Sequence, residues 1–547
     1  MEALFIFYFY SGILMTYSID FGTSNTVVAR WNAATGKAET LTVPTFSQKI
    51  AQNPPLIPSL LYVEDGAIGK AIVGQVVRDR ALDTATNARF FRNFKRGIGT
   101  AVQGFQPELD GVTIGPEQIG SWYLEQVITQ AKQADPGILD SVVFTVPVDS
   151  FEAYRLWLGR VCQTIGINQV RLLDEPTAAA LGYGLANQEL LLVIDFGGGT
   201  LDLSLVRSEM KENSQIKPTG FILKWGQKDF AQQSGQKLKI ANVIAKAGQN
   251  LGGADLDNWL MDYFKETQGL AVNAISMRLV ERLKINLSLQ SQAQEAFFDD
   301  ENFETYELNL TRDRFEQILQ ERQFFDRLDA SMNQVIQQAK RQGIELADIG
   351  AVLMVGGTSQ IPAMQTWITK YFEASKIRSD KPFEAIAHGA LQLDQGVEVK
   401  DYLYHGYGIR YWDRRLNAHN WHPIIKTGQA YPMEKPVELT LSASVSNQPS
   451  IELIIGELAE NNNQTEVYFD GDRLITRNLA TNQLNVQTLN DKDGSRSIAE
   501  LDPPGEPGRD RIKVKFQVDK KRFLRITVDD LLTSRTIVMN EPVVELS

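Results

Sequence analysis

Hydrophobic and polar residues follow two different patterns along the chain. Up to about Leu393, fully apolar runs such as 191–194 alternate with segments of helical periodicity such as 281–288. From Gly406 onward, short alternating runs are separated by Asn, Asp, Gly and Pro, and they predict strands at 437–445, 451–458, 465–474, 511–519 and 523–530. We therefore predict an α/β domain followed by an all-β sandwich domain.

One apolar run leads into a turn of unusual composition. Residues 191–194 predict a buried strand, and residues 201–205 alternate between apolar and polar as in a second strand. Between them lie Asp195, three consecutive glycines and Thr200. Three glycines cost backbone entropy and weaken a strand, so we expect another group to approach this turn too closely for a Cβ atom.

This pattern occurs twice in the chain. The stretches SIDFGTSNTVV (18–28) and VIDFGGGTLDL (193–203) both place Ile-Asp-Phe-Gly at the end of an apolar run. Each stretch predicts a β-hairpin with a Gly-containing turn. The long separation between the two copies is typical of a duplicated domain half.

Two such hairpins that face each other would form a polyphosphate site. Their turns offer backbone N–H groups and the hydroxyls of Thr23, Ser24 and Thr200. Asp20 and Asp195 add two carboxylates, which are the ligands that hold hydrated Mg²⁺ beside phosphates. Glycine leaves room for a bulky anion to approach the backbone. The alternative is a pair of ordinary hairpins in which the two aspartates form turns.

Composition narrows the class of protein. The 547 residues are enough for two to four domains, and 43% hydrophobic with 22% charged residues is ordinary for a globular protein. A net charge of −12 argues against general binding of nucleic acid or of acidic membranes. Cys162 is the single cysteine, which excludes an internal disulfide, so we expect a reducing compartment, the cytoplasm.

The N-terminal residues need a separate interpretation. The apolar run from Leu4 to Tyr10 is too short to span a bilayer and lacks the basic flank of a signal peptide. Because Met15 directly precedes the patterned sequence, we expect translation to start there and residues 1–14 to be a non-native or flexible extension. The alternative is a genuine extension that touches a membrane.

Eight stretches in order resemble the actin-like ATPase superfamily and, within it, the DnaK-type chaperones of the heat-shock protein 70 family. They are IDFGTSN (19–25), FKRGIG (94–99), VVFTVPVDSFEAYR (142–155), LLDEPTAAALGYG (172–184), IDFGGGTLDLS (194–204), NLGGADLDNWL (250–260), ERLKINLS (281–288) and VLMVGGTSQIP (352–362). The glycine turns alone would also fit actin or a sugar kinase, whereas DEPTAAALGYG together with LGGADLD is specific to the chaperones. The resemblance implies a duplicated actin-like (ribonuclease-H-like) ATPase domain and then a peptide-binding β-domain.

The resemblance also implies a site for ATP or ADP with Mg²⁺, and K⁺ is a further candidate cation. The phosphates would lie between Gly22, Thr23, Ser24 and Asn25 of the first turn and Gly197, Gly198, Gly199 and Thr200 of the second, with Gly252 and Gly253 close by. The adenosine would contact Glu281, Lys284 and Ser288, which share one helical face, and Gly356, Gly357 and Thr358 after the strand at 351–355. On the residues alone, an amphipathic helix with a solvated charged face is favoured for 281–288.

Hydrolysis in this family is an attack of water on the γ-phosphoryl group, helped by positioning and charge neutralisation. Lys95 matches the family's lysine that holds this water, and Glu175 matches the carboxylate that orients water or metal. Thr200 would bond the terminal phosphate, while Asp20 and Asp195 would surround the metal and its waters. Without the resemblance, the neighbouring arginines favour a solvated basic helix around Lys95.

The chain departs from the family pattern at several places. Gln360 replaces the arginine that stacks on adenine, which puts nucleotide affinity or base selectivity in doubt. Residues 208–238 form a longer polar segment, which we interpret as a surface insertion. The linker at 396–405 lacks the family's leucine run, and the given sequence ends where relatives continue into a helical lid, so we expect a lidless variant.

These observations give a domain division and a ranked set of functions. We predict an extension at 1–14, an ATPase domain at 15–395, a linker at 396–405 and a β-sandwich at 406–547. The leading hypothesis is a monomeric ATP-driven chaperone that binds unfolded or extended polypeptides, works with a J-domain co-chaperone and a nucleotide exchange factor, and binds neither nucleic acid nor membrane. One alternative is a nucleotide-sensing module for a dedicated protein partner, with weak or no ATPase. A small-molecule kinase is weaker, because no general-base carboxylate is identifiable.

Overall fold

The computed structural model describes most of the chain between residues 16 and 546. Outside the described part lie 1–15, 33, 50–52, 85–87, 100–105, 136–140, 148–151, 168, 185–189, 211–221, 225–238, 300–302, 396–402, 404–405, 414–417, 427–428, 430, 434, 459–462, 471–472, 481–485, 491–495, 520–521 and 547. These gaps include the predicted extension, most of the predicted insertion and all of the predicted linker except Leu403. No helix in the described ranges is both long and apolar enough to cross a membrane.

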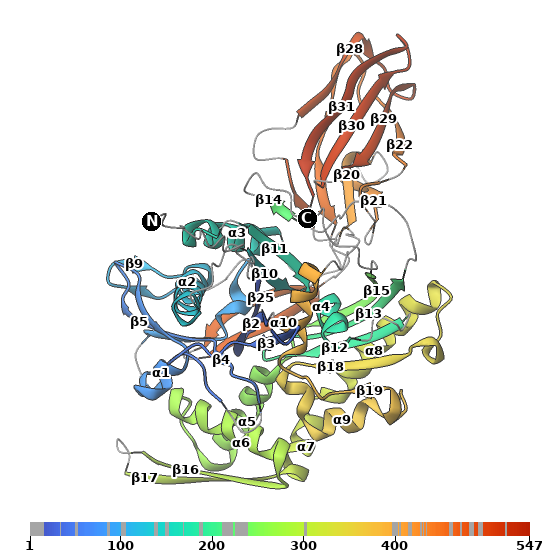
Figure 1. The fold of residues 1–547 in the computed structure, drawn as a ribbon. Helices are drawn as coiled ribbons and strands as arrows, with labels where there is room; N and C mark the ends of the chain where they lie inside the picture. Colours follow the sequence, from blue (N-terminus) through green and yellow to red (C-terminus); the bar gives the residue numbers. More distant parts are fainter. Residues whose placement is uncertain are drawn as a thin grey trace, which may run out of the picture. The chain divides into compact units, whose positions relative to one another are not determined.

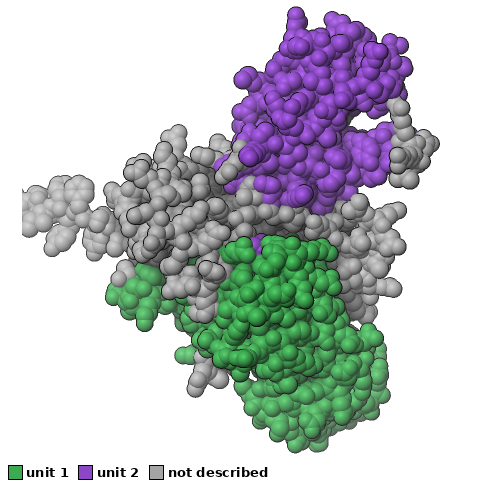
Figure 2. Space-filling model, turned by 90° about the vertical axis from the view of Figure 1, so that its right-hand side faces the viewer, with its two compact units in different colours: residues 1–241, 245–398, 468–475 green, residues 242–244, 399–467, 476–547 purple. Residues whose placement is uncertain are grey.

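The chain divides into two compact units (Figure 2). The larger unit contains residues 1–241, 245–398 and 468–475, and the smaller unit contains 242–244, 399–467 and 476–547. The larger unit mixes helices and sheets, whereas the smaller unit is built from strands (Figure 1). This change of secondary structure follows the two hydrophobic patterns of the sequence.

The first sheet of the larger unit is built around the first hairpin. Its strand order is β14-β11-β10-β1-β2-β3, and β4 also pairs with β2. The strands are β1 (Thr16–Phe21), β2 (Asn25–Asn32), β3 (Lys37–Thr40), β4 (Ile57–Pro58), β10 (Ser141–Val146), β11 (Gln169–Asp174) and β14 (Ile222–Lys224). β1, β10 and β11 run parallel, whereas β2 and β14 are antiparallel to their neighbours. One strand of the predicted insertion, β14, thus extends this sheet.

The second sheet repeats the same arrangement around the second hairpin. Its order is β15-β13-β12-β18-β19, with β12 antiparallel to β13 and parallel to β18. The strands are β12 (Leu190–Phe196), β13 (Leu201–Met210), β15 (Lys239–Gln249), β18 (Ala351–Val355) and β19 (Ile377–Arg378). When β4 and β14 of the first sheet are left out and the other strands are numbered within each half, both sheets have the order 3-2-1-4-5. The repeat seen in the sequence is therefore present in the sheet topology.

Helices and small sheets complete the larger unit. The helices are α1 (Gln75–Asp79), α2 (Pro116–Ala134), α3 (Glu152–Ile165), α4 (Glu175–Gly182), α5 (Gly253–Gln268), α6 (Ala274–Leu289), α7 (Arg312–Glu321), α8 (Phe324–Arg341), α9 (Pro362–Ile368) and α10 (Ala385–Ala390). The additional strands are β5 (Leu60–Asp65), β6 (Lys70–Val73), β7 (Phe90–Arg92), β8 (Glu108–Leu109), β9 (Val112–Thr113), β16 (Gln292–Asp299) and β17 (Glu304–Thr311). The predicted helix at 281–288 lies within α6.

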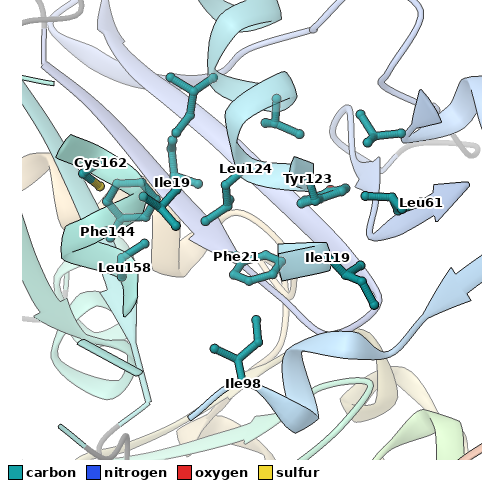
Figure 3. Close-up of a cluster of buried hydrophobic side chains, with 14 of the residues drawn as sticks. Ile19, Phe21, Leu61, Ile98, Ile119, Tyr123, Leu124, Phe144, Leu158 and Cys162 are labelled. Atoms are coloured by element: carbon teal, nitrogen blue, oxygen red, sulfur yellow. The ribbon is translucent and has the colours of Figure 1, made fainter. Parts of the chain in front are cut away.

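The core of the first half lies between its sheet and helices α2 and α3. Figure 3 shows Phe21 of β1 and Phe144 of β10 among side chains of these helices, including Tyr123 and Leu158. The Phe21 ring stacks on Tyr123 with 5.7 Å between ring centroids. Burial of each such side chain contributes roughly 1.5–3 kcal/mol to the free energy of unfolding. This packing fixes the end of β1, where Asp20 and the first turn begin.

Helices α4 and α10 cross in direct backbone contact. A methyl group at Gly182 of α4 would collide with the carbonyl oxygen of Ala385, and one at Gly389 of α10 would collide with that of Ala178. Each helix therefore presents an Ala-x-x-x-Gly face to the other. The contact is reciprocal, and it brings the start of α4, at Glu175, to a fixed place between the sheets.

The smaller unit contains two four-stranded sheets, ordered β21-β20-β24-β27 and β22-β29-β30-β31, and the two-stranded sheet β23-β28. The two-stranded sheet β25-β26 includes residues 468–475, which belong to the larger unit. The strands are β20 (Gly406–Asp413), β21 (Ala418–Ile425), β22 (Val437–Ser442), β23 (Gln448–Leu453), β24 (Ile455–Leu458), β25 (Asn463–Asp470), β26 (Arg473–Ala480), β27 (Val486–Thr488), β28 (Arg496–Gly505), β29 (Asp510–Val518), β30 (Phe523–Asp530) and β31 (Arg535–Glu545). Side chains from both large sheets share one hydrophobic core, as expected for a β-sandwich.

Two predicted strands are divided in the structure, and one of them is the run 465–474, whose residues belong to β25 and β26. The run 451–458, predicted as one strand, is divided between β23 and β24, which belong to different sheets. Three consecutive buried residues, Leu453 to Ile455, explain the division, because one strand would turn alternate side chains outward. Leu403, at the end of the predicted linker, is fully buried in the core of the smaller unit, and its N–H donates to Gln429.

The helix crossing predicts a position that cannot accept alanine. We expect Gly389→Ala to lower the free energy of unfolding by about 1–3 kcal/mol, because the added methyl overlaps a backbone oxygen that cannot move freely. Gly115→Ala is the matched control, since the nearest atom to its added methyl belongs to a side chain, Gln106, at 3.6 Å. Urea titration of both variants measures the effect, and an equal loss in both would contradict it.

His388 of α10 predicts a loss of stability in mild acid. Burial, and then the nearby Lys381, lowers the pKa of His388 to about 4, and His388 Nε2 shares a hydrogen bond of 2.9 Å with Thr40. The unfolded chain binds this proton at a higher pH, near 6.5. The free energy of unfolding should therefore fall between pH 6.5 and 4, by at most about 1.4 kcal/mol per pH unit from this group. Urea midpoints of His388→Gln should depend less on pH over this interval than those of the wild type.

Candidate functional site

The two glycine turns have the same local structure. In the first, the N–H of Gly22 donates to the carbonyl of Asn25 at 3.1 Å, and in the second the N–H of Gly197 donates to that of Thr200 at 3.1 Å. Asp20 and Asp195 each precede the last residue of their strand, β1 or β12. The duplicated sequence therefore builds two equivalent turns with one carboxylate beside each.

These turns face each other. A methyl group at Gly198 would collide with Ser24 Oγ, and one at Gly199 would come within 2.5 Å of Thr23 Oγ1. Arg96 holds the second turn from the first half, because its Nη2 donates to the carbonyl of Gly199 at 2.9 Å. The glycine run thus has a physical reason, since hydroxyl side chains of the opposite turn occupy the space that Cβ atoms would need.

Lys95 lies in a buried ion pair beside the turns. It belongs to a short 3₁₀ helix, Phe94–Gly97, and its Nζ is 3.3 Å from Glu175 Oε1, the first residue of α4. The side chains are only 12% and 8% exposed. The solvated basic helix considered for this stretch is therefore wrong for Lys95.

Several carboxylates share this buried space. Burial and then repulsion from Glu175 raise the pKa of Asp20 to about 6, although Lys95 and a hydrogen bond from Thr145 Oγ1 at 2.8 Å oppose the shift. Burial raises the pKa of Asp195 well above its usual value, with further contributions from Glu175 and other aspartates. Burial alone would lower the pKa of Lys95, but the attraction of Glu175 and other groups outweighs it.

This charge distribution fits a divalent cation. The carboxyl groups of Asp20 and Asp195 are buried near the Lys95–Glu175 pair, and burial with repulsion from neighbouring carboxylates raises the pKa of both aspartates. Within the described part of the chain, no three His, Cys, Asp or Glu side chains lie close enough to ligate one metal ion by themselves. Mg²⁺ suits such a site, because it keeps several waters and uses only one or two carboxylates together with phosphate oxygens.

The second half also brings the predicted glycines 252 and 253 to its turn. The N–H groups of Gly253 and Ala254, at the start of α5, donate to Gly197 and Gly198 at 3.1 and 2.9 Å. A methyl group at Gly252 would collide with the carbonyl of Gly198. Thr358 Oγ1 donates to the carbonyl of Gly197 at 2.8 Å. The predicted positions 252, 253 and 358 therefore converge on the second turn.

Two charged residues of α6, Glu281 and Lys284, form ion pairs within the larger unit. Lys284 Nζ lies 2.7 Å from Asp257 and donates to the carbonyl of Gly253 at 2.8 Å. Glu281 lies 3.4 Å from Arg78, and the surrounding cations lower its pKa against the effect of burial. Ser288 Oγ donates back to the carbonyl of Lys284 within the helix. Lys284 thus joins the predicted adenosine face directly to the phosphate-side glycines.

The third glycine segment follows β18. Gly356 has φ +81°, and an added methyl would collide with the carbonyl of Phe196, so only glycine fits this crossing. The methyl of an alanine at position 357 would lie 3.1 Å from the ring of Phe383. The Gln360 amide is 3.4 Å from Ser359 Oγ and 3.5 Å from the carbonyl of Ser379.

Some residues of the site were not singled out from the sequence. Arg96 pairs with Asp255 at 2.8 Å and joins the two halves, and Asp255 also accepts the N–H of Gly252 at 2.8 Å. Thr145 bonds Asp20, and Asp257 neutralises Lys284. All four lie inside the quoted motifs FKRGIG, VVFTVPVDSFEAYR and NLGGADLDNWL, so motif membership was the available signal.

Comparison with protein families agrees with this geometry. The family model described as Hsp70 protein matches residues 17–402, more than half of the chain. The chain therefore belongs to the Hsp70 family, and it is a chaperone of the Hsp70 type. Members of this family are ATPases that bind ATP or ADP with Mg²⁺, and they bind unfolded polypeptides and co-chaperones.

The contact between the turns predicts different outcomes for two adjacent glycines. We expect Gly198→Ala to lower the free energy of unfolding by about 1–3 kcal/mol, because its methyl would overlap Ser24 Oγ. Gly197→Ala should change it by less than about 0.5 kcal/mol, since the nearest atom, Asp195 Oδ1, is 3.9 Å away. Chemical unfolding without nucleotide tests this pair, and a larger loss for Gly197→Ala would show that the turns do not touch as described.

Proposed function

We propose that the larger unit hydrolyses ATP slowly and that the nucleotide state controls the binding of extended polypeptides by the smaller unit. The single observation that carries this proposal is the buried cluster of Lys95, Glu175, Asp20 and Asp195 beside two facing glycine turns. The backbone N–H groups of the turns can bind the phosphates of a nucleotide, and the acidic side chains can bind Mg²⁺ directly or through water. A site for a magnesium nucleotide needs both kinds of group.

The proposed nucleotide lies along the residues that converge on the second turn. The phosphates would bind the N–H groups and hydroxyls of 22–25 and 197–200, and the adenosine would lie between α6 and the segment 356–358. The two turns are in direct contact, which supports a phosphate site formed by both halves. One turn alone would surround only one side of the phosphates. Bound Mg²⁺ would neutralise charge on the phosphates, held through Asp20, Asp195 and water.

Hydrolysis would depend on positioning by this chain's own residues. Lys95 is held by Glu175 and remains charged, so it can donate to an attacking water and stabilise charge that develops on the γ-phosphoryl group. Glu175 can orient the same water. Thr200 can donate its hydroxyl to the terminal phosphate. No covalent intermediate is needed for this reaction.

The smaller unit has features that suit an extended polypeptide. Its exposed large apolar side chains include Tyr411, Trp412, Val445, Leu531, Leu532, Ile537 and Met539. The strand β31 forms the end of its sheet, in the order β22-β29-β30-β31. Backbone hydrogen bonds with apolar contacts are the usual way in which β-domains hold extended segments. A J-domain co-chaperone and a nucleotide exchange factor would set the rates of hydrolysis and release.

Removal of the Lys95 ammonium should abolish hydrolysis but preserve binding. We expect Lys95→Met to lower the single-turnover rate of ATP hydrolysis at least a hundredfold, because a preorganised donor in a buried site is lost. The dissociation constant for ADP should stay within about threefold. Lys340→Met on the exposed surface of α8 is the matched control. Unchanged hydrolysis in Lys95→Met would refute the assignment.

Coupling between the units can be measured with a fluorescent extended peptide. We expect the anisotropy to show that the peptide binds about tenfold more weakly in ATP than in ADP. After addition of ATP, Lys95→Met should keep the weak peptide affinity for longer than the wild type does, because it hydrolyses ATP more slowly. Equal peptide affinity in both nucleotides would refute coupling. Purification of one stoichiometric protein partner, together with no peptide binding, would instead favour the nucleotide-sensing module.

A further inference from the structure

The hairpin formed by β20 and β21 is rich in aromatic and basic residues. Residues 406–425 contain two tryptophans, two tyrosines, two histidines and three arginines, against a single carboxylate, Asp413. Two of the arginines belong to residues 414–417, which lie outside the described part of the chain. Because the whole chain has a net charge of −12, this hairpin is a locally basic segment of an acidic protein.

Strand β20 directs two of these side chains away from the core. Tyr407 and Ile409 are buried in the hydrophobic core of the smaller unit. Since side chains alternate along a strand, Arg410 and Trp412 lie on the opposite, outer face of the hairpin.

Strand β21 adds an aromatic partner to each of them. Trp421 lies opposite Arg410 and His419 lies opposite Trp412, and directly opposite residues share one face. The ring centroids of Trp412 and His419 are 5.0 Å apart. A methyl group at Gly456 of β24 would come within 2.5 Å of the Trp421 ring, so this indole covers the neighbouring strand. We call the set of Arg410, Trp412, His419 and Trp421 the aromatic-basic face.

The aromatic-basic face is accessible, and its positive charge is not balanced. Trp412 is 42% exposed, His419 is exposed and Arg410 is half-buried. Within the described ranges, no hydrogen bond or ion pair engages the guanidinium of Arg410. Asp413 lies on the other face of the hairpin, because it directly follows Trp412 along the strand. The face therefore offers a guanidinium beside indole rings without a carboxylate of its own.

We propose that the aromatic-basic face binds an acidic, extended segment of a polypeptide. The Arg410 guanidinium would pair with a carboxylate of the segment, and the indoles of Trp412 and Trp421 would pack on its neighbouring apolar side chains. Strand β21 is the edge of its sheet, in the order β21-β20-β24-β27, so an extended segment can lie along it. This inference rests on the polypeptide binding in the proposed function, and it names the kind of polypeptide that the smaller unit takes.

An acidic polypeptide fits the charge of this chain better than a nucleic acid does. Aromatic and basic side chains together also suit single-stranded nucleic acid. A nucleic acid, however, carries a negative charge at every nucleotide, and a protein with a net charge of −12 repels the part that extends beyond the hairpin. A short acidic segment places its charges on the hairpin alone.

Fluorescence anisotropy with the full chain tests this inference. The probes are a labelled peptide in which Glu residues alternate with Val and Pro, and a counterpart with Lys in place of Glu. We expect the Glu peptide to bind at least about tenfold more tightly than the Lys peptide. Arg410→Gln and Trp412→Ala should each weaken its binding about five- to tenfold, because a charge-assisted hydrogen bond or an aromatic contact is lost. Arg535→Gln, at an exposed arginine of β31, is the matched control.

The outcomes separate this inference from the proposed function. Equal binding of the two peptides, or unchanged affinity for the Glu peptide in both variants, would overturn the inference. Tighter binding of a labelled oligothymidylate that the same variants weaken would also overturn it, because the face would then serve nucleic acid. If the Glu peptide is selected but ATP is not hydrolysed, the proposed function fails and the inference stands. A preference that both variants lose and Arg535→Gln keeps supports the inference.

Discussion

Several glycines of the larger unit lie so close to atoms of the facing segment that a side chain at these positions would collide with them. Gly198 meets Ser24 between the turns, and Gly182 and Gly389 meet carbonyl oxygens across the α4–α10 crossing. Packed interiors deform little, so such contacts determine how the halves fit. Glu175 begins α4, so the crossing also sets the position of the carboxylate that pairs with Lys95.

The buried charges at this junction are unfavourable in the absence of a ligand. Burial and mutual repulsion oppose ionisation of Asp20 and Asp195, and one lysine does not balance them. A buried carboxylate without a full set of partners lowers the free energy of unfolding. A cation that binds only the folded state raises it again. Under the proposed function, the arrangement that weakens the free protein would favour binding of a magnesium nucleotide, which is the usual relation between stability and function at a site.

Sequence alone predicted the repeated hairpins and α6, because local pattern and tertiary burial agree there. It failed where tertiary context decides. The stretch around Lys95 has the composition of a solvated helix, yet the partner that buries it, Glu175, is distant in the chain. The run 451–458 divides between two sheets, which no local pattern encodes.

Contacts around α6 differ in kind from those at the turns. Arg78 and Glu281 connect α6 to the region before β7 through an ion pair at 3.4 Å whose side chains are both partly exposed. Such pairs contribute little free energy and are screened by salt, so they can break and form again. Backbone contacts at glycine cannot do this. The contacts at the turns are consequently less able to rearrange than this ion pair of α6.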